Sequence, residues 1–278
     1  MNPRRILALT VAVAAFPAAT AHADQPLDPA TGGVNLSAGG GYAVWAEPAE
    51  DTGWQLVVRS PDGAVSRPRV PGFAGPPDVS VGTGGGDPRP LMAVYSRSTG
   101  SNEDLFALDL LTGREHRVVA VSTARADEAH PSLQYGRLAF VRRGGAKPGV
   151  YVWNGRGAAR RVTSTAATQT AVSESRVAFA TATRVTVRPH SGRGATSTFR
   201  TTARPRSLVL SRYRVGWLQG EGRVMQSDRV TGGGTDVVRT ANRALPPATQ
   251  SIALESESIG LRLGADGLQR LDPELAFR

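Results

Sequence analysis

The chain has 278 residues, no cysteine and a formal net charge of +10 at pH 7. The absence of cysteine excludes disulfides, thiolate metal sites and a lipoprotein anchor. All basic residues except Lys147 are arginine, and aromatic residues make up only 6% of the chain. Nucleic-acid-binding surfaces interleave basic with aromatic residues or carry a recognisable reading module, so we attribute the charge to arginine-rich codon usage and expect no nucleic-acid partner.

Residues 1–23 have the features of a secretory signal peptide. Arg4 and Arg5 precede a short apolar run, and Ala21-His22-Ala23 forms a small-x-small cleavage site before Asp24. No later segment approaches the ~18 uninterrupted apolar residues of a membrane span. We therefore expect the protein to be exported by the secretory route or, given the arginine pair, by the twin-arginine route. Its expected location is the periplasm, the cell envelope or the outside of the cell.

A five-residue pattern recurs in the 255 residues that follow the leader, which carry a net charge of +8. Its six copies are GYAVW (41–45), LMAVY (91–95), GRLAF (136–140), SRVAF (175–179), YRVGW (213–217) and, more weakly, ESIGL (257–261). Their last residues are about 43 residues apart on average. Because the third and fifth positions are apolar and share one face of a strand, we expect the aromatic series from Trp45 to Trp217, with Leu261 in the sixth copy, to form the core between repeated units. Trp54 and Trp153 lie outside the series and are the expected exposed contacts.

The rest of each period also aligns. A short strand is predicted before each copy, at 33–37, 77–81, 130–134, 170–174, 206–211 and 250–255. A third strand is predicted at 55–59, 105–109, 150–153, 184–188 and 223–228, and a fourth at 64–70, 114–121, 158–163, 195–202 and 235–240. A glycine at a fixed offset after the third strand predicts a recurring tight turn at Gly63, Gly113, Gly157, Gly192 and Gly232. Segments 265–272 and 273–278 are the candidates for the last two strands of the sixth period.

Six periods with four strands each and no helix predict an all-β fold, a six-bladed β-propeller with four-stranded antiparallel blades. A two-sheet sandwich is the alternative, but it would not require the same pattern six times. The predicted blades cover residues 33–74, 75–127, 128–167, 168–204, 205–246 and 247–278, and residues 24–32 are expected to be a linker.

The unit at 130–163, which contains HPSLQYGRLAFVRR, GVYVWN and ARRVT, resembles the repeat of TolB-type propellers, also described as WD40-like repeats of exported bacterial proteins. The resemblance implies a propeller fold, export and a binding rather than a catalytic role. Two features depart from the family. The Ser-Pro-Asp-Gly turn belongs between the first two strands of a TolB-type blade, whereas residues 60–63 lie between the third and fourth. The 255 residues also leave no room for the α/β domain that precedes the TolB propeller, so its partnership with the peptidoglycan-associated lipoprotein is not carried over.

Candidate site residues are few. The innermost strands offer mostly serine, asparagine and glutamine, which make a poor cage for a hard metal ion. The candidate ligand-binding residues at the channel mouth are Asp78, Asp127, Glu128 and His130. One histidine and two carboxylates from a single loop could serve a metal or proton transfer, but more often cap a turn. We therefore assign no catalytic residue, no metal ligand and no cofactor.

The sequence favours a non-catalytic, monomeric scaffold that binds a protein, another ligand or an envelope component and has no membrane span. The alternative is a propeller hydrolase or lactonase with a metal in the axial channel, which would need several blades to send carboxylates or histidines inward. A third hypothesis is electrostatic attachment to envelope polyanions through the outer-strand arginines Arg67, Arg117, Arg161, Arg200 and Arg239.

Overall fold

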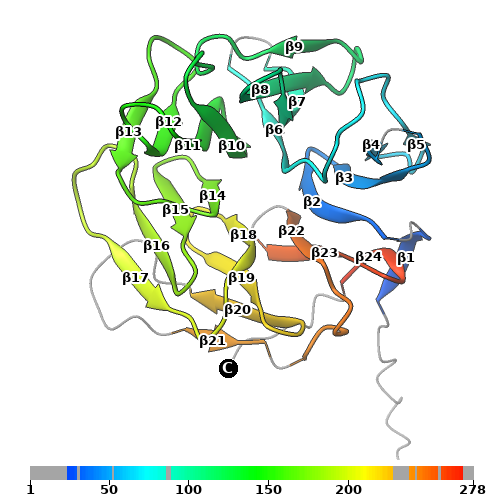
Figure 1. Cartoon of the computed structure of the whole chain (residues 1–278). Coiled ribbons are helices and arrows are strands. Elements are labelled where there is room, and N and C mark those ends of the chain that lie inside the picture. Colours follow the sequence, from blue (N-terminus) through cyan, green and yellow to red (C-terminus); the bar gives the residue numbers. More distant parts are fainter. Residues whose placement is uncertain are drawn as a thin grey trace, which may run out of the picture.

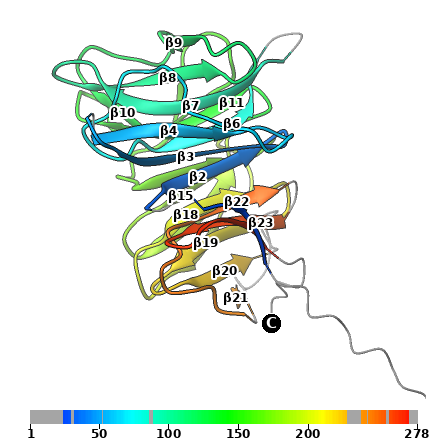
Figure 2. The ribbon, with the colours of Figure 1, turned by 90° about the vertical axis from the view of Figure 1, so that its right-hand side faces the viewer.

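The computed structural model describes residues 24–29, 32–51, 53–85, 89–227, 238–241, 243–255 and 258–271. All strands of these residues belong to six four-stranded antiparallel sheets, and none of these residues is helical. Figure 1 looks along the axis of the ring that the six sheets form. Figure 2 shows the ring from the side, with the strands running roughly parallel to its axis. The predicted six-bladed propeller is confirmed.

Each blade contributes one strand to each of four concentric positions. The inner strands are β2 (Val34–Gly39), β6 (Val79–Thr83), β10 (Asp127–Gln134), β14 (Gln169–Val172), β18 (Arg206–Leu210) and β22 (Ser251–Glu255). The second strands are β3 (Tyr42–Ala49), β7 (Leu91–Ser98), β11 (Arg137–Arg143), β15 (Arg176–Ala180), β19 (Val215–Gln219) and β23 (Ser258–Gly264). The third strands are β4 (Gly53–Arg59), β8 (Glu103–Asp109), β12 (Gly149–Trp153), β16 (Arg184–Pro189), β20 (Arg223–Ser227) and β24 (Gly267–Arg270). The outer strands are β5 (Val65–Ser66), β9 (Glu115–Arg117), β13 (Arg160–Thr163), β17 (Ser197–Arg200), β21 (Arg239–Thr240) and β1 (Gln25–Asp28).

The N-terminal strand closes the ring. The sequence predicted a linker at 24–32, but residues 25–28 form β1, which pairs antiparallel with β24 and so completes the sixth blade. The predicted outer strand at 273–278 lies outside the described residues. The pairing has a physical reason. Without β1, β24 would be an unpaired edge of its sheet, and the N-terminal segment lies beside it in space.

The hydrophobic core is divided into six clusters, and each lies between two neighbouring blades. The cluster between blades 2 and 3, for example, joins Val94 and Leu105 of one blade to Phe140 and Tyr151 of the next. The other five clusters join the remaining neighbours, including blade 6 and blade 1. Each blade therefore buries both of its faces against its neighbours, as the large and small positions of the repeat predicted.

The aromatic series occupies these interfaces as predicted. Trp45, Tyr95, Phe140 and Trp217 are fully buried, and Phe179 is nearly so. Leu261 of the sixth copy is also buried between blades, as predicted, but it faces the following blade instead of the preceding one and joins the cluster with Trp45, between blades 6 and 1. Because side chains alternate along a strand, its neighbour Arg262 faces the other way, the direction that the aromatic residues take in the other blades. That arginine is only 3% exposed and binds Asp24, Asp266 and Gln269.

The turns between third and fourth strands follow the glycine prediction. Gly63, Gly113, Gly157 and Gly192 have φ of 90°, 70°, 59° and 76°, a left-handed conformation that glycine adopts without strain. Gly232 lies outside the described residues. In the second blade Asp109 accepts hydrogen bonds from the backbone N–H groups of Leu111 and Thr112, and these bonds, that of Thr112 first, hold the pKa of Asp109 below its ordinary value.

Candidate functional site: the mouth of the axial channel

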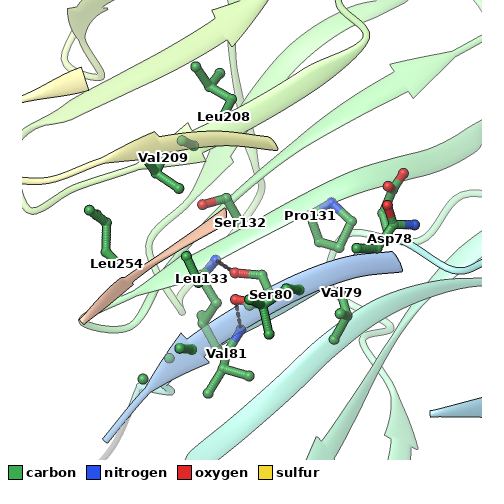
Figure 3. A pocket seen from close by; sticks show the side chains of 18 of the residues that line it. Asp78, Val79, Ser80, Val81, Pro131, Ser132, Leu133, Leu208, Val209 and Leu254 are labelled. Atoms are coloured by element: carbon green, nitrogen blue, oxygen red, sulfur yellow. Dashed lines mark hydrogen bonds between the residues drawn. The ribbon is translucent and has the colours of Figure 1, made fainter. Parts of the chain in front are cut away.

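A cavity of about 510 Å³ runs along the axis and is lined by residues of all six inner strands. Each inner strand contacts the next, and β22 contacts β2, so the strands form a closed ring around the cavity. We call the end at which the inner strands begin the channel mouth. Figure 3 shows part of this lining, with Asp78 beside Pro131 and far from Leu254 in the view.

One polar residue per blade stands at an equivalent position near the mouth. The pairing of each inner strand with its second strand aligns Asn35, Asp78, His130, Gln169, Ser207 and Ser251. We call these six residues the mouth ring, and all of them line the cavity. Of the six, only the two ionisable members were predicted as site residues, because the six differ in type and share no motif.

Three members of the mouth ring adopt a left-handed backbone. Asn35, His130 and Ser207 have φ of 58°, 51° and 52°, and they belong to blades 1, 3 and 5. In each case the register shifts between inner and second strand, as in a β-bulge. Left-handed non-glycine residues inside strands are uncommon and concentrate at binding sites, where a bulge re-aims a side chain.

Inner-strand side chains also join the blades to one another. The backbone N–H groups of Val81, Leu133, Val172, Leu208 and Ile252 donate to Ser37 Oγ, Ser80 Oγ, Ser132 Oγ, Gln169 Oε1 and Ser207 Oγ at 2.8–3.0 Å. Figure 3 shows the bonds to Leu133 and Val81 as dashed lines. An inner strand is an edge of its sheet, so its outward N–H groups need partners from outside that sheet. The serines that the sequence suggested as channel lining therefore join blade 1 to blade 2, 2 to 3, 3 to 4 and 5 to 6, and Gln169 joins blade 4 to blade 5.

Asp78 and His130 form the only carboxylate–imidazole contact among the described residues of the mouth ring. Asp78 Oδ2 contacts His130 Nδ1, and their side chains are 33% and 21% exposed. The His130 carbonyl accepts a hydrogen bond from Thr170 Oγ1 at 2.6 Å. The Asp78–His130 contact thus links blades 2 and 3 at the mouth, and Thr170 of blade 4 holds the backbone of His130.

The other two candidate residues do not line the cavity. Asp127 begins β10 and accepts a hydrogen bond at 3.0 Å from the backbone N–H of Glu103, which begins β8, so it joins blade 3 to blade 2. Glu128 has a fully buried side chain, and its Oε1 lies 2.8 Å from Arg142 Nε and 3.0 Å from Thr123 Oγ1. Burial raises the pKa of Glu128, while the bonds from Thr123 and Arg142 act in the opposite direction. Its position and partners indicate a structural ion pair.

The channel mouth offers little chemistry for catalysis. In the part of the chain that the structure describes, no three histidine, aspartate or glutamate side chains come together in a way that could hold a metal ion. At the mouth there is one carboxylate and one imidazole, and they already contact each other. The serines beside them are committed to bonds between blades. The donor set therefore falls short of the three or more protein ligands that catalytic metal sites use.

The outer-strand arginines do not form the uniform basic belt of the third hypothesis. Arg67 pairs with Glu47 at 2.7 Å and Arg117 with Asp104 at 2.8 Å, while Arg161 donates to the Pro148 carbonyl. Arg200 is exposed, and Arg239 has a partner. At least two of the five charges are thus neutralised within their own blades.

The two tryptophans expected to be exposed are half-buried. Trp54 packs against the core between blades 1 and 2 and forms a β-bridge with Phe73. Trp153 packs against the core between blades 2 and 3 and donates its indole N–H to the Gly157 carbonyl. Neither is a free contact surface.

No protein-family model matches the chain, and no curated protein is significantly similar to it in sequence. Solved structures are similar in fold at low identity. The chain is 15% identical to a chain of the mitotic checkpoint complex (TM-score 0.57, covering 96% of this chain and 99% of that chain). It is 13% identical to the WD40 propeller domain of Doa1 (TM-score 0.55, covering 89% and 96%). TolB from Acinetobacter baumannii is also similar, at 12% identity (TM-score 0.48, covering 75% and 56%). The likenesses to the chain of the mitotic checkpoint complex and to the WD40 domain show the propeller fold. No described segment forms a helix long and apolar enough to cross a membrane.

Proposed function

We propose that the protein is an exported, non-catalytic scaffold that binds a partner protein at the mouth of its axial channel. The composition of the mouth ring carries the proposal. Six polar residues from six blades line the cavity there, three of them on left-handed backbone. Gln169 and Ser207 already bond neighbouring blades, and the ring contains no set of reacting groups. Export is supported by the leader-like residues 1–23.

The fold is used for protein assembly elsewhere. Among similar propellers, one comes from the mitotic checkpoint complex and another, 10% identical with a TM-score of 0.53, from a nidogen–laminin complex. Fold alone does not determine function, so the proposal rests on the chain's own channel mouth.

A photo-crosslinking experiment tests the proposal. Gln250 lines the cavity and is exposed, so a photo-reactive amino acid at this position would face a ligand at the mouth. Tyr213 is the matched control, because it is 51% exposed in the turn between β18 and β19, at the opposite end of the ring. In cells that make the protein, we expect a covalent adduct with one partner protein from position 250 and none from position 213.

The same purified protein is assayed for hydrolysis of lactones, esters and phosphoesters, with and without added Zn²⁺, Mg²⁺ or Ca²⁺. We expect no turnover above the blank. Turnover that is lost in the Asp78→Asn variant, with no adduct at position 250, would favour the hydrolase alternative and overturn the proposal.

A further inference from the structure

The positive charge of the protein is concentrated in its middle part, from blade 3 to blade 5. Residues 128–227 contain 17 basic residues and only three carboxylates, Glu128, Glu174 and Glu221, whereas the rest of the chain after residue 23 contains 14 basic and 20 acidic residues. Ten of the 17 basic residues are the arginines of residues 168–227. Arginine-rich codon usage explains arginine in place of lysine. It does not explain why carboxylates are scarce in this part of the chain.

Five of these arginines lie at the same end of the ring as the channel mouth. Arg184 begins β16, Arg200 ends β17, Arg204 lies in the connection 201–205, Arg206 begins β18 and Arg223 begins β20. Because strand direction alternates in each blade, these ends all lie where the inner strands begin. We call them the arginine row. It starts at the outer rim of blade 4 and reaches the cavity, which Arg206 lines; Figure 1 shows β16 and β17 side by side in the outer part of blade 4 and β18 nearer the axis.

The row lacks internal neutralisation. The side chains of Arg184, Arg200, Arg204 and Arg223 are exposed, and none has a carboxylate partner among the described residues. Arg184 and Arg200 are directly paired across β16 and β17. Like charges at such a position destabilise a sheet. Glu221, which is exposed in the turn before Arg223, is the one carboxylate of blades 4 and 5 at this end of the described structure.

The backbone that presents the row is fixed in place. Thr201 N–H donates to the Thr183 carbonyl at 3.0 Å, and Gln219 Nε2 of blade 5 donates to Thr202 Oγ1 at 2.5 Å. Arg206 Nη2 donates to the Gly220 carbonyl at 2.8 Å, which holds this guanidinium at the mouth. Arginines on a preorganised backbone lose less freedom when they bind an anion.

We propose that the arginine row binds an acidic segment of the partner protein, which lies in extended form along the connection 201–205 with one end at the channel mouth. This inference rests on the proposed function and names the chemistry of the partner. Carboxylates pair with guanidinium groups through two parallel hydrogen bonds. The six steps along the chain from Arg200 to Arg206 span at most about 20 Å, the length of an extended peptide of about six or seven residues.

An acidic peptide fits this surface better than a nucleic acid or a membrane. Single-stranded nucleic acids stack on exposed aromatic rings, and the exposed tyrosines of the described chain, Tyr135 and Tyr213, lie at the opposite end of the ring. Binding to a membrane surface would use exposed apolar side chains beside the basic residues, and none of the large exposed ones belongs to blade 4 or to the connection 201–205.

The test measures binding of a fluorescein-labelled deca-glutamate peptide to purified residues 24–278 by fluorescence anisotropy. The Arg200→Gln/Arg204→Gln variant removes two charges of the row. The matched control, Arg69→Gln/Arg125→Gln, removes two exposed arginines from connections between other blades at the same end of the ring. We expect binding that weakens with salt, falls roughly tenfold in the first variant and changes less than about twofold in the control.

Absence of peptide binding at low salt, or equal losses in the two variants, would overturn the inference. So would tighter binding of duplex DNA or of phosphatidylglycerol vesicles that depends on the same two arginines. These outcomes are distinguishable from a failure of the proposed function. If only the inference about the arginine row is wrong, the adduct from position 250 still forms in the Arg200→Gln/Arg204→Gln variant; if the proposed function is wrong, no adduct forms even in the wild type.

Discussion

Replacing Gly267 by alanine tests the closure of the ring at a single position. Gly267 begins β24 with φ of 92°, and a Cβ placed there would lie 2.1 Å from the carbonyl oxygen of Asp28 and 3.0 Å from Pro29 Cα. Both contacts are with backbone, so β1 has to move away from β24. Gly157 is the matched control, because it has φ of 59° but nothing within 4 Å of the added Cβ.

The magnitude follows from two contributions. Alanine in the left-handed region costs about 1–2 kcal/mol at either position. Only at position 267 does the substitution also displace β1, which pairs with β24 at three positions and packs Leu27 against the core between blades 6 and 1. Net hydrogen bonds of ~1 kcal/mol each put that loss at roughly 2–3 kcal/mol. At 2–4 °C per kcal/mol, Gly267→Ala should melt about 5–10 °C below Gly157→Ala.

Thermal unfolding of the two variants measures this difference, and hydrogen exchange locates it. In Gly267→Ala the amides of β24 should lose protection while those of blade 3 keep it. Equal melting temperatures for the two variants, with β24 still protected, would refute the closure of the ring by β1.

Three further changes probe the interfaces between blades. Phe140→Ala should lower the free energy of unfolding by about 3–5 kcal/mol, because the fully buried ring lies between blades 2 and 3; a urea melt within error of the wild type would contradict that placement. Glu128→Ala should cost about 3–5 kcal/mol, because it leaves the guanidinium of Arg142 without its carboxylate, and adding Arg142→Met should recover part of the loss. A double variant no more stable than the single one would show that the charge left behind is not the cause. Arg262 holds the pKa of Asp266 below its ordinary value of 3.8, so the ionised carboxylate stabilises the fold above that value and the contribution is lost as pH falls through the lower folded pKa. The difference in melting temperature between the wild type and Asp266→Asn should therefore be largest near pH 7 and shrink as the pH falls below 3.8, and a constant difference would contradict the pairing.

The repeat was predictable because it is encoded locally. A buried aromatic residue within the second strand and a glycine at a fixed offset after the third strand recur in every clear copy, and both reflect constraints within one blade. The sixth blade was harder to align. Its inner strand shifts register between Ala253 and Leu254, and Arg262 takes the direction of the aromatic residues, so the pattern pointed to Leu261 instead. The strand β1 has four residues and no repeat signature, so only the pairing with β24 reveals it.

The site was less accessible from sequence than the fold. His130 and Asp78 were identified by type, but their contact depends on the left-handed backbone at His130 and on the packing of blades 2 and 3. Glu128 follows Asp127 in the same segment and was grouped with it, although strand alternation directs its side chain into the protein and toward Arg142. The serines Ser37, Ser80 and Ser132 were visible at matching places in three repeats, and that regularity was a signal of a structural role.

Closure by β1 also determines when the molecule becomes complete. Five of the six blades pair strands that are close in the sequence, so each can form soon after it is synthesised. The sixth pairs Gln25 with Arg270, and contacts between such distant residues form slowly because a long loop must first close. Until then the unpaired edges of β1 and β24 are available to other chains. The interval before the last blade is complete is therefore the period in which the chain is most exposed to misassembly.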